Sequence, residues 1–97
     1  MSGRLSDSQI EAALLTLPGW TRDGGEILKT FKFTNFVEAM GFVNRVAAEA
    51  EAANHHPDID IRWNSVRMVL STHSQGGLTQ KDIHLANRIE AAARPTL

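Results

Sequence analysis

The sequence predicts an α+β fold in which a four-stranded, mainly antiparallel sheet has helices packed on one face. Three observations predict it. Apolar residues recur at helical spacing in three segments, they alternate with polar residues in two later segments, and turn residues separate the segments in the order α-β-β-α-β-β-α. A chain of 97 residues is enough for one core. We therefore expect a single domain over residues 1–97.

End signals mark the first helix and the first strand pair. Ser6 begins a capping-box pattern, and the Pro-Gly pair at 18–19 is expected to end the helix. Strands are then predicted over 20–22 and 26–33, with the turn sequence Asp-Gly-Gly at 23–25 between them. Two strands joined by so short a turn are expected to pair antiparallel.

The longest helix is expected to follow. Asn35 is its expected N-cap. Its inward face is predicted from helical spacing to consist of Phe36, Met40, Val43, Val46/Ala47 and Ala50. The helix should end near Asn54, because Pro57 disfavours helical backbone at His56.

The second strand pair carries the alternating pattern. Ile59, Ile61 and Trp63 alternate with charged residues, so Trp63 is expected on the apolar face. With residues 64–65 as a two-residue turn, Trp63 would pair with Val66 and His56 would face His73. This register would gather three imidazoles, with that of His55, at one end of the hairpin.

The last helix has a clear beginning. Thr79 is its expected cap, and Asp82 stands three residues later, where a carboxylate caps the backbone and meets the positive end of the helix dipole. Leu78 and Ile83 have the spacing of a hydrophobic staple. From these residues alone, a capping role is favoured for Asp82.

Composition argues against several function classes. The formal net charge is −1, which argues against a general nucleic-acid binder, and the chain has no cysteine for a disulfide or a thiolate site. No apolar run approaches the length of a membrane span, and no signal peptide is expected. We expect a cytoplasmic protein that does not associate with membranes.

A cluster of histidines could carry acid–base chemistry. Imidazole titrates near neutral pH, so such a cluster can offer a protonated donor beside a neutral acceptor. Glu51 is a candidate to orient the cluster. A zinc site with Glu51 or Asp82 is the alternative, but neighbouring side chains such as those of His55 and His56 point to opposite faces of an extended chain, so no metal is expected. His84 has no partner at useful spacing and is interpreted as a surface residue.

The pattern of these residues resembles a known signature. The signature of the pterin-4a-carbinolamine dehydratases is similar to Glu51-x3-His55-His56-Pro57-x5-Trp63-x9-His73-x8-Asp82. The flanking sequences Leu70-Ser71-Thr72-His73 and Gly77-Leu78-Thr79 also look like that family. The similarity covers most of the chain.

The resemblance implies roles for individual residues. His55 and His73 would be the catalytic acid and base, in an order that the sequence leaves open. The substrate-binding residues would be His56, Glu51, Trp63, Ser71 and Thr72. Asp82, Pro57 and Asn54 would have supporting roles. At the position of Asn54, some members of the family carry an acidic residue instead.

The resemblance also implies an activity. The enzyme would dehydrate 4a-hydroxytetrahydrobiopterin to quinonoid dihydrobiopterin in tetrahydrobiopterin recycling, without metal or organic cofactor. It would form a homodimer or homotetramer and be functionally linked to an aromatic amino acid hydroxylase. The alternative is a non-catalytic family member that acts as a protein-binding or assembly factor.

Overall fold

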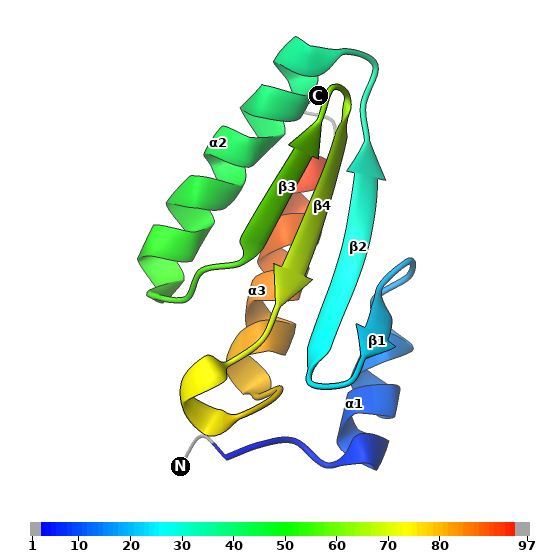
Figure 1. The fold of residues 1–97 in the computed structure, drawn as a ribbon, viewed down its shortest axis with the longest axis vertical. Coiled ribbons are helices and arrows are strands. Elements are labelled where there is room, and N and C mark those ends of the chain that lie inside the picture. Colours follow the sequence, from blue (N-terminus) through cyan, green and yellow to red (C-terminus); the bar gives the residue numbers. More distant parts are fainter. Residues whose placement is uncertain (1–2, 95–97) are drawn as a thin grey trace.

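The computed structural model describes residues 3–94 and has the expected element order (Figure 1). The elements are α1 (Asp7–Leu14), β1 (Thr21–Asp23), β2 (Glu26–Lys32), α2 (Phe36–Ala53), β3 (Asp58–Arg62), β4 (Ser65–Leu70), the short 3-10 helix η1 (His73–Gln75) and α3 (Gln80–Ala93).

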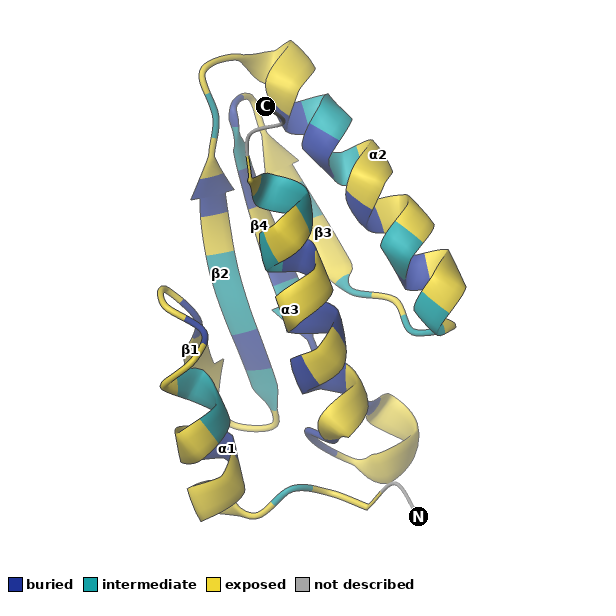
Figure 2. Ribbon diagram, turned by 180° about the vertical axis from the view of Figure 1, so that it is seen from behind, coloured by how far each residue is buried: buried dark blue, intermediate teal, exposed yellow. Residues whose placement is uncertain are grey.

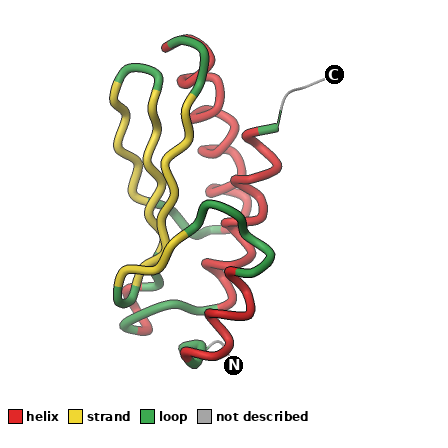
Figure 3. Tube along the Cα trace, turned by 90° about the vertical axis from the view of Figure 1, so that its right-hand side faces the viewer, coloured by secondary structure: helices red, strands yellow, loops and turns green. Residues whose placement is uncertain are grey.

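The four strands form one sheet in the order β1-β2-β4-β3, and every neighbouring pair is antiparallel. The helices pack on one face of this sheet, and the other face is uncovered (Figure 3). The predicted α+β class is confirmed. Within residues 3–94, no helix combines the length and the apolar character needed to cross a membrane.

The core lies between the sheet and the helices. Alternate residues of the two central strands turn toward the helices and are buried, and so is one stripe along each of α2 and α3 (Figure 2). The buried strand and helix residues are Ile27, Phe31, Val66, Met68, Leu70, Ala39, Phe42, Val46, Ala50, Ile83, Leu85, Ala86 and Ile89. Burial of these apolar side chains, at roughly 25 cal/mol per Å², is the main force that holds the layers together.

The predicted helix ends are largely confirmed. Ser6 and Thr79 each cap their helix in a complete capping box. Asn54 ends α2 in the left-handed region, with φ of 51°, a conformation that asparagine tolerates better than most residues. One end differs: α1 stops at Leu14, before the Pro-Gly pair at 18–19.

The predicted register of the second hairpin was wrong. The closing pair lies one position earlier on each strand than predicted, so each residue faces a residue two positions from its predicted partner. Arg62 pairs with Ser65, so Trp63 and Asn64 form the loop and His56 is not opposite His73. The cause is Asn64, whose Nδ2 donates to the Phe33 carbonyl while its own carbonyl accepts from the Phe33 N–H, both at 2.8 Å. Asn64 is thereby held inside, and Trp63 is 69% exposed instead of lying in the core.

The predicted inward face of α2 was also partly wrong. Ala39 and Phe42 are buried, whereas Phe36 is exposed and Met40 is only partly covered. Phe42 sets this rotation of the helix, because its ring packs 4.9 Å from the rings of both Phe31 and Phe33.

Candidate active site

The candidate site begins where α2 ends. Asn54 turns the chain sharply, and the N–H of His55 still donates to the Ala50 carbonyl at 3.2 Å. This last backbone contact fixes His55 against the end of the helix. Pro57 then precedes β3, so the two histidines occupy the short connection between α2 and the sheet.

Asp82, in the first turn of α3, is the centre of the polar contacts. Its side chain is fully buried. One oxygen, Oδ1, lies 2.6 Å from Nε2 of His55. The other oxygen, Oδ2, accepts from the Thr79 N–H at 2.9 Å and from the Thr72 hydroxyl at 2.7 Å. Asp82 therefore caps the helix, as the sequence indicates, and also holds a histidine with its second oxygen.

This contact selects the tautomer of His55. A carboxylate only accepts hydrogen bonds, so Nε2 of His55 carries a proton toward Asp82. Nδ1 of His55 makes no hydrogen bond to any of the described residues 3–94 and remains the nitrogen available to exchange a proton. The side chain is 12% exposed. An Asp–His pair of this kind orients an imidazole and stabilises its cation.

His56 has a different partner. Its Nε2 lies 2.5 Å from Oε2 of Glu51, on the last turns of α2. Both side chains are largely exposed. Glu51 therefore orients His56, and within residues 3–94 no hydrogen bond or ion pair joins it to His55.

His73 begins η1 and is exposed. It directly follows Thr72, whose hydroxyl is bonded to Asp82. Thr72 in turn pairs with Gly77, which closes the loop that contains η1. His55 and His73 are thus connected through Thr72 and Asp82, and not through the hairpin register that the sequence predicts.

The other predicted site residues make no hydrogen bond to His55 or Asp82 within residues 3–94. Ser71 is half-buried between β4 and Thr72. Trp63 lies beyond the far end of β3, with the five residues of that strand between it and Pro57. Among residues 3–94, no three histidine, aspartate or glutamate side chains are grouped closely enough to hold a metal ion.

The sequence reasoning missed the part that Thr72 plays. Its hydroxyl bonds to Asp82 and lies 2.8 Å from the hydroxyl of Thr79, and both threonines are buried. Thr79 carries a readable capping signal. No sequence signal marks the contact of Thr72 with Asp82, because it depends on how the hairpin packs against α3.

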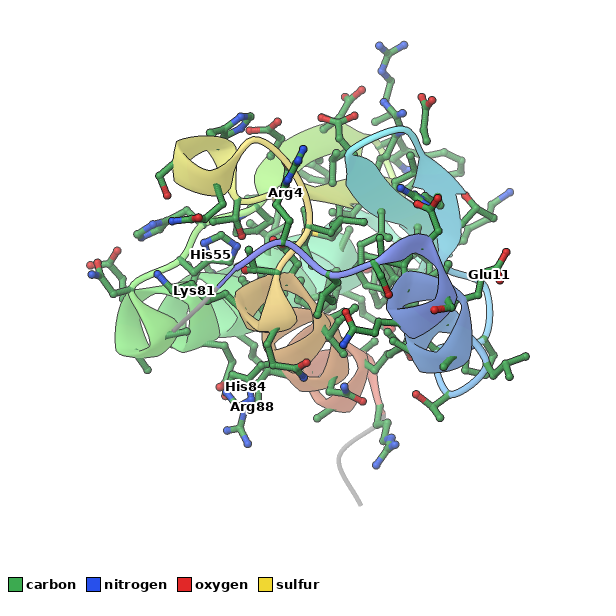
Figure 4. All side chains as sticks on the ribbon, turned by 90° about the horizontal axis from the view of Figure 1, so that it is seen from below. Arg4, Glu11, His55, Lys81, His84 and Arg88 are labelled. Carbon is green, nitrogen blue, oxygen red and sulfur yellow. The ribbon has the colours of Figure 1, made fainter. Side chains whose placement is uncertain are left out.

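A second ionic group lies elsewhere on the surface. Arg88 donates to Glu49 at 2.8 Å and joins α3 to α2. This hydrogen bond lowers the pKa of Glu49 below its ordinary value of 4.5, and the charges of Arg88 and His84 act in the same direction. Figure 4 shows His84 and Arg88 together and apart from His55.

Two surface hollows are lined by other parts of the chain. One of about 790 Å³ lies between the start of α2 and the end of α3, beside Lys32, Val37 and Arg45. The other, of about 700 Å³, lies between α1 and the loops at Gly24-Gly25 and Gly76-Gly77. None of the candidate site residues lines either hollow, so both hollows lie outside the candidate active site.

Comparisons with known proteins identify relatives of the chain. The family model for pterin 4 alpha carbinolamine dehydratase matches residues 3–92. A relative from Roseiflexus sp. (strain RS-1), assigned as a pterin-4-alpha-carbinolamine dehydratase, is 58% identical over 90 residues, which are 93% of this chain and 97% of the relative. A relative from Nocardia farcinica with the same assignment is 57% identical over 93% of this chain and 95% of its own length.

Solved structures with this fold are also known. A transcriptional coactivator/pterin dehydratase from Brucella melitensis has a TM-score of 0.92 and 37% identity, and the match covers 95% of this chain and all of that one. A pterin dehydratase-like protein, described as a RuBisCO assembly factor in the alpha-carboxysome, has a TM-score of 0.65 and 22% identity over 79% of this chain and 89% of its own. The second likeness concerns the fold alone.

Proposed function

The chain belongs to the pterin 4 alpha carbinolamine dehydratase family of hydro-lyases, and on this premise we propose that it removes water from a 4a-hydroxytetrahydropterin to give a quinonoid dihydropterin. The observation that carries the proposal is the pairing of His55 with the buried Asp82. It supports a histidine that is held in one orientation and has one nitrogen free for proton transfer.

The reaction needs one proton given and one proton taken. An imidazolium donates a proton to the 4a-hydroxyl, the lone pair of a ring nitrogen assists cleavage of the C–O bond, and water leaves. A neutral imidazole then accepts the proton that the pterin ring loses, and the new C=N bond remains. Histidine suits both steps because its two protonation states coexist near neutral pH.

We assign these two steps to His55 and His73. Asp82 stabilises the cation of His55 when Nδ1 is protonated, which supports His55 as a group that can hold and release a proton. His73 supplies the second imidazole from the start of η1, one residue from Thr72. The family resemblance supports this pair, and the order of acid and base depends on how the pterin lies between them.

His56 and Glu51 are proposed to bind the substrate. Their side chains are exposed and already paired at 2.5 Å, so they offer a polar edge to the amide and amine groups of a pterin ring. Ser71 and Trp63 are also proposed to bind the substrate, and the family resemblance alone supports this role. No metal or organic cofactor is required in this mechanism.

The wider role forms part of the proposal. The activity would recycle tetrahydrobiopterin for an aromatic amino acid hydroxylase in the cytoplasm. Homo-oligomer formation is supported by exposed apolar residues: Phe36 and Val37 on α2, and Ile59 and Ile61 on β3, which is an edge strand of the sheet.

The proposal is tested by following quinonoid product formation from synthetic 4a-hydroxytetrahydropterin. The purified protein should accelerate dehydration, and His55→Ala should lower kcat by about 100- to 10,000-fold. His84→Ala is the matched control, because His84 lies apart from His55 (Figure 4), and it should keep wild-type kinetics. A wild-type protein that leaves the uncatalysed rate unchanged contradicts the proposal.

A further inference from the structure

We propose that Thr72 is a positioning residue that fixes the Asp82 carboxylate and, through it, the tautomer of His55. This inference rests on the proposed function. It assigns Thr72 a role other than the substrate contact that the family resemblance implies. The hydroxyl of Thr72 donates to Oδ2 of Asp82 at 2.7 Å, and the side chain of Asp82 is fully buried.

All the polar atoms of Thr72 have partners within the chain. Its N–H donates to the Gly77 carbonyl at 3.0 Å, and its carbonyl accepts from the N–H groups of Gln75 at 2.9 Å and Gly77 at 3.4 Å. The hydroxyl contacts Asp82 and Thr79. The residue is only 4% exposed. Thr72 therefore has no polar group left for a pterin, and its polar contacts serve the fold and the carboxylate.

The hydroxyl protons can be placed in order. The hydroxyl of Thr72 has a single proton, which goes to Asp82, so the 2.8 Å contact between the two threonines is donated by Thr79. The oxygen of Thr79 in turn accepts from the N–H of Lys81 at 3.3 Å. The N–H of Lys81 thus donates to the Thr79 hydroxyl. That hydroxyl donates to the Thr72 hydroxyl, which donates to Asp82.

This order determines which oxygen meets His55. Oδ2 of Asp82 receives two donors, the Thr72 hydroxyl and the Thr79 N–H, and they hold the carboxylate in one plane. Oδ1 is left facing Nε2 of His55 at 2.6 Å. Without the Thr72 hydroxyl, the carboxylate keeps one donor on Oδ2 and can rotate about its bond. The proton of His55 is then free to move between the two ring nitrogens.

The test compares Thr72→Val, which loses the hydroxyl at nearly constant shape, with Thr72→Ser, which keeps the hydroxyl. Thr30→Val is the matched control, because Thr30 is exposed on β2 and away from the network. The tautomer of His55 is read from the ¹⁵N chemical shifts of its ring, assigned by comparison with His55→Ala. Steady-state kinetics with synthetic 4a-hydroxytetrahydropterin give kcat and KM separately.

We expect the Nε2–H tautomer in the wild type, a mixture of tautomers in Thr72→Val, and the single tautomer again in Thr72→Ser. In Thr72→Val, kcat should fall about 10-fold or more, the effect of one lost hydrogen bond to a charged group, with KM within about twofold. If valine prevents folding, Thr72→Ala removes the hydroxyl without adding a group.

Two results would overturn the proposal. One is an unchanged His55 tautomer in a folded variant without the hydroxyl. The other is a rise in KM at constant kcat, which would assign Thr72 to substrate binding. A wild-type protein without dehydratase activity contradicts the proposed function alone, because the tautomer of His55 is measured without substrate and still decides the role of Thr72.

Discussion

His55 and Asp82 lie 27 residues apart in the chain, yet Nε2 of His55 is 2.6 Å from Oδ1 of Asp82. The contact joins the end of α2 to the beginning of α3. The same carboxylate caps α3 through its other oxygen. Two of the predictions below concern this site, and three concern contacts elsewhere in the fold.

Asp82→Asn should separate the two roles of this side chain. The amide oxygen of Asn can still accept from the Thr79 N–H, so the helix cap is retained and the free energy of unfolding should fall by only about 1–2 kcal/mol. The amide nitrogen is a donor, so Nε2 of His55 must become an acceptor. By analogy with the Asp-to-Asn change in a serine protease triad, kcat should fall about 10,000-fold.

Urea denaturation and product formation check this prediction. Thr79→Ala is the matched control, because it removes the capping hydroxyl and leaves the carboxylate of Asp82 in place. Its loss of stability should be about 1 kcal/mol, with a much smaller loss of kcat. Equal kcat for Asp82→Asn and the wild type would show that the Asp–His contact has no role in the reaction.

His73→Ala and His56→Ala should affect different kinetic constants. His73 is assigned to proton transfer, so its removal should lower kcat by about 100-fold or more. His56 is assigned to binding, so its removal should raise KM and leave kcat within a few fold. Both side chains are exposed, and both variants should retain the wild-type unfolding midpoint. The reverse pattern would exchange the two roles.

Glu90→Ala should destabilise the fold away from the site. Oε1 of Glu90 accepts from Nε1 of Trp20 at 2.8 Å and from the ammonium of Lys29, and this joins α3 to β2. The pair is mostly buried, so removal of Glu90 leaves the ammonium of Lys29 without its carboxylate and with the Pro18 carbonyl as its remaining acceptor. The free energy of unfolding should fall by about 2–3 kcal/mol, less than for a fully buried pair.

Chemical denaturation followed by circular dichroism measures this loss. Asp7→Ala is the control, because the Arg22–Asp7 pair is exposed and should be worth less than about 1 kcal/mol. A loss for Glu90→Ala no larger than that of the control would contradict the role given to this contact.

Trp63→Asn should stabilise the protein. Trp63 has φ of 53°, a conformation that is strained for an aromatic residue, and its side chain gains little burial in return. Asparagine adopts this conformation more readily, so the free energy of unfolding should rise by about 0.5–1 kcal/mol. Trp63→Phe retains the strained backbone conformation, so its free energy of unfolding should stay near that of the wild type.

The same two variants test the function of Trp63. If this residue binds the pterin, KM should rise in Trp63→Asn although the protein is more stable. A strained residue retained at a cost in stability is typical of a functional position. A fall in stability for Trp63→Asn would instead show that the tryptophan side chain makes contacts that outweigh the strain.

The Glu49–Arg88 pair should make stability depend on pH. The pKa of Glu49 is lowered by its hydrogen bond from Arg88, so the pair stabilises the folded chain fully above pH 4.5, and the contribution is lost as the pH falls through the folded value. Arg88→Gln should therefore have a lower urea midpoint than the wild type at pH 7, and the difference should shrink as the pH falls below 4.5 and through the lowered pKa of Glu49.

Lys32→Gln is the control for a lost positive charge. Lys32 is exposed and makes no ion pair within the described part of the chain. The urea midpoint of Lys32→Gln should therefore equal that of the wild type at pH 7 and at about pH 3.5. A difference between Arg88→Gln and the wild type that is as large at about pH 3.5 as at pH 7 would contradict the assignment.

The fold could be predicted from the sequence where the signals are local. Ser6, Asn54 and Thr79 mark helix ends through residues within a few positions of each, and all three are confirmed. The hairpin register was wrong because it depends on a contact between Asn64 and Phe33, 31 residues apart. No local pattern shows that a tryptophan will take a positive φ in the turn.

The site could be predicted only in part for the same reason. The sequence singles out His55, His56 and His73 as residues suited to acid–base chemistry. It assigns the cap to Asp82 from spacing alone, and this is confirmed. The contact between Asp82 and His55, and the inward direction of the Thr72 hydroxyl, arise from the packing of α3 against the hairpin and the end of α2, which spacing does not encode.

The shared carboxylate of Asp82 has a consequence for local opening of the protein. The Thr79 N–H and the ring of His55 are bound to the same side chain. Fraying of the first turn of α3 that breaks the Thr79–Asp82 bond therefore also frees the carboxylate that holds His55. Hydrogen exchange at the Thr79 amide thus reports how often the site comes apart, in a protein that is otherwise folded.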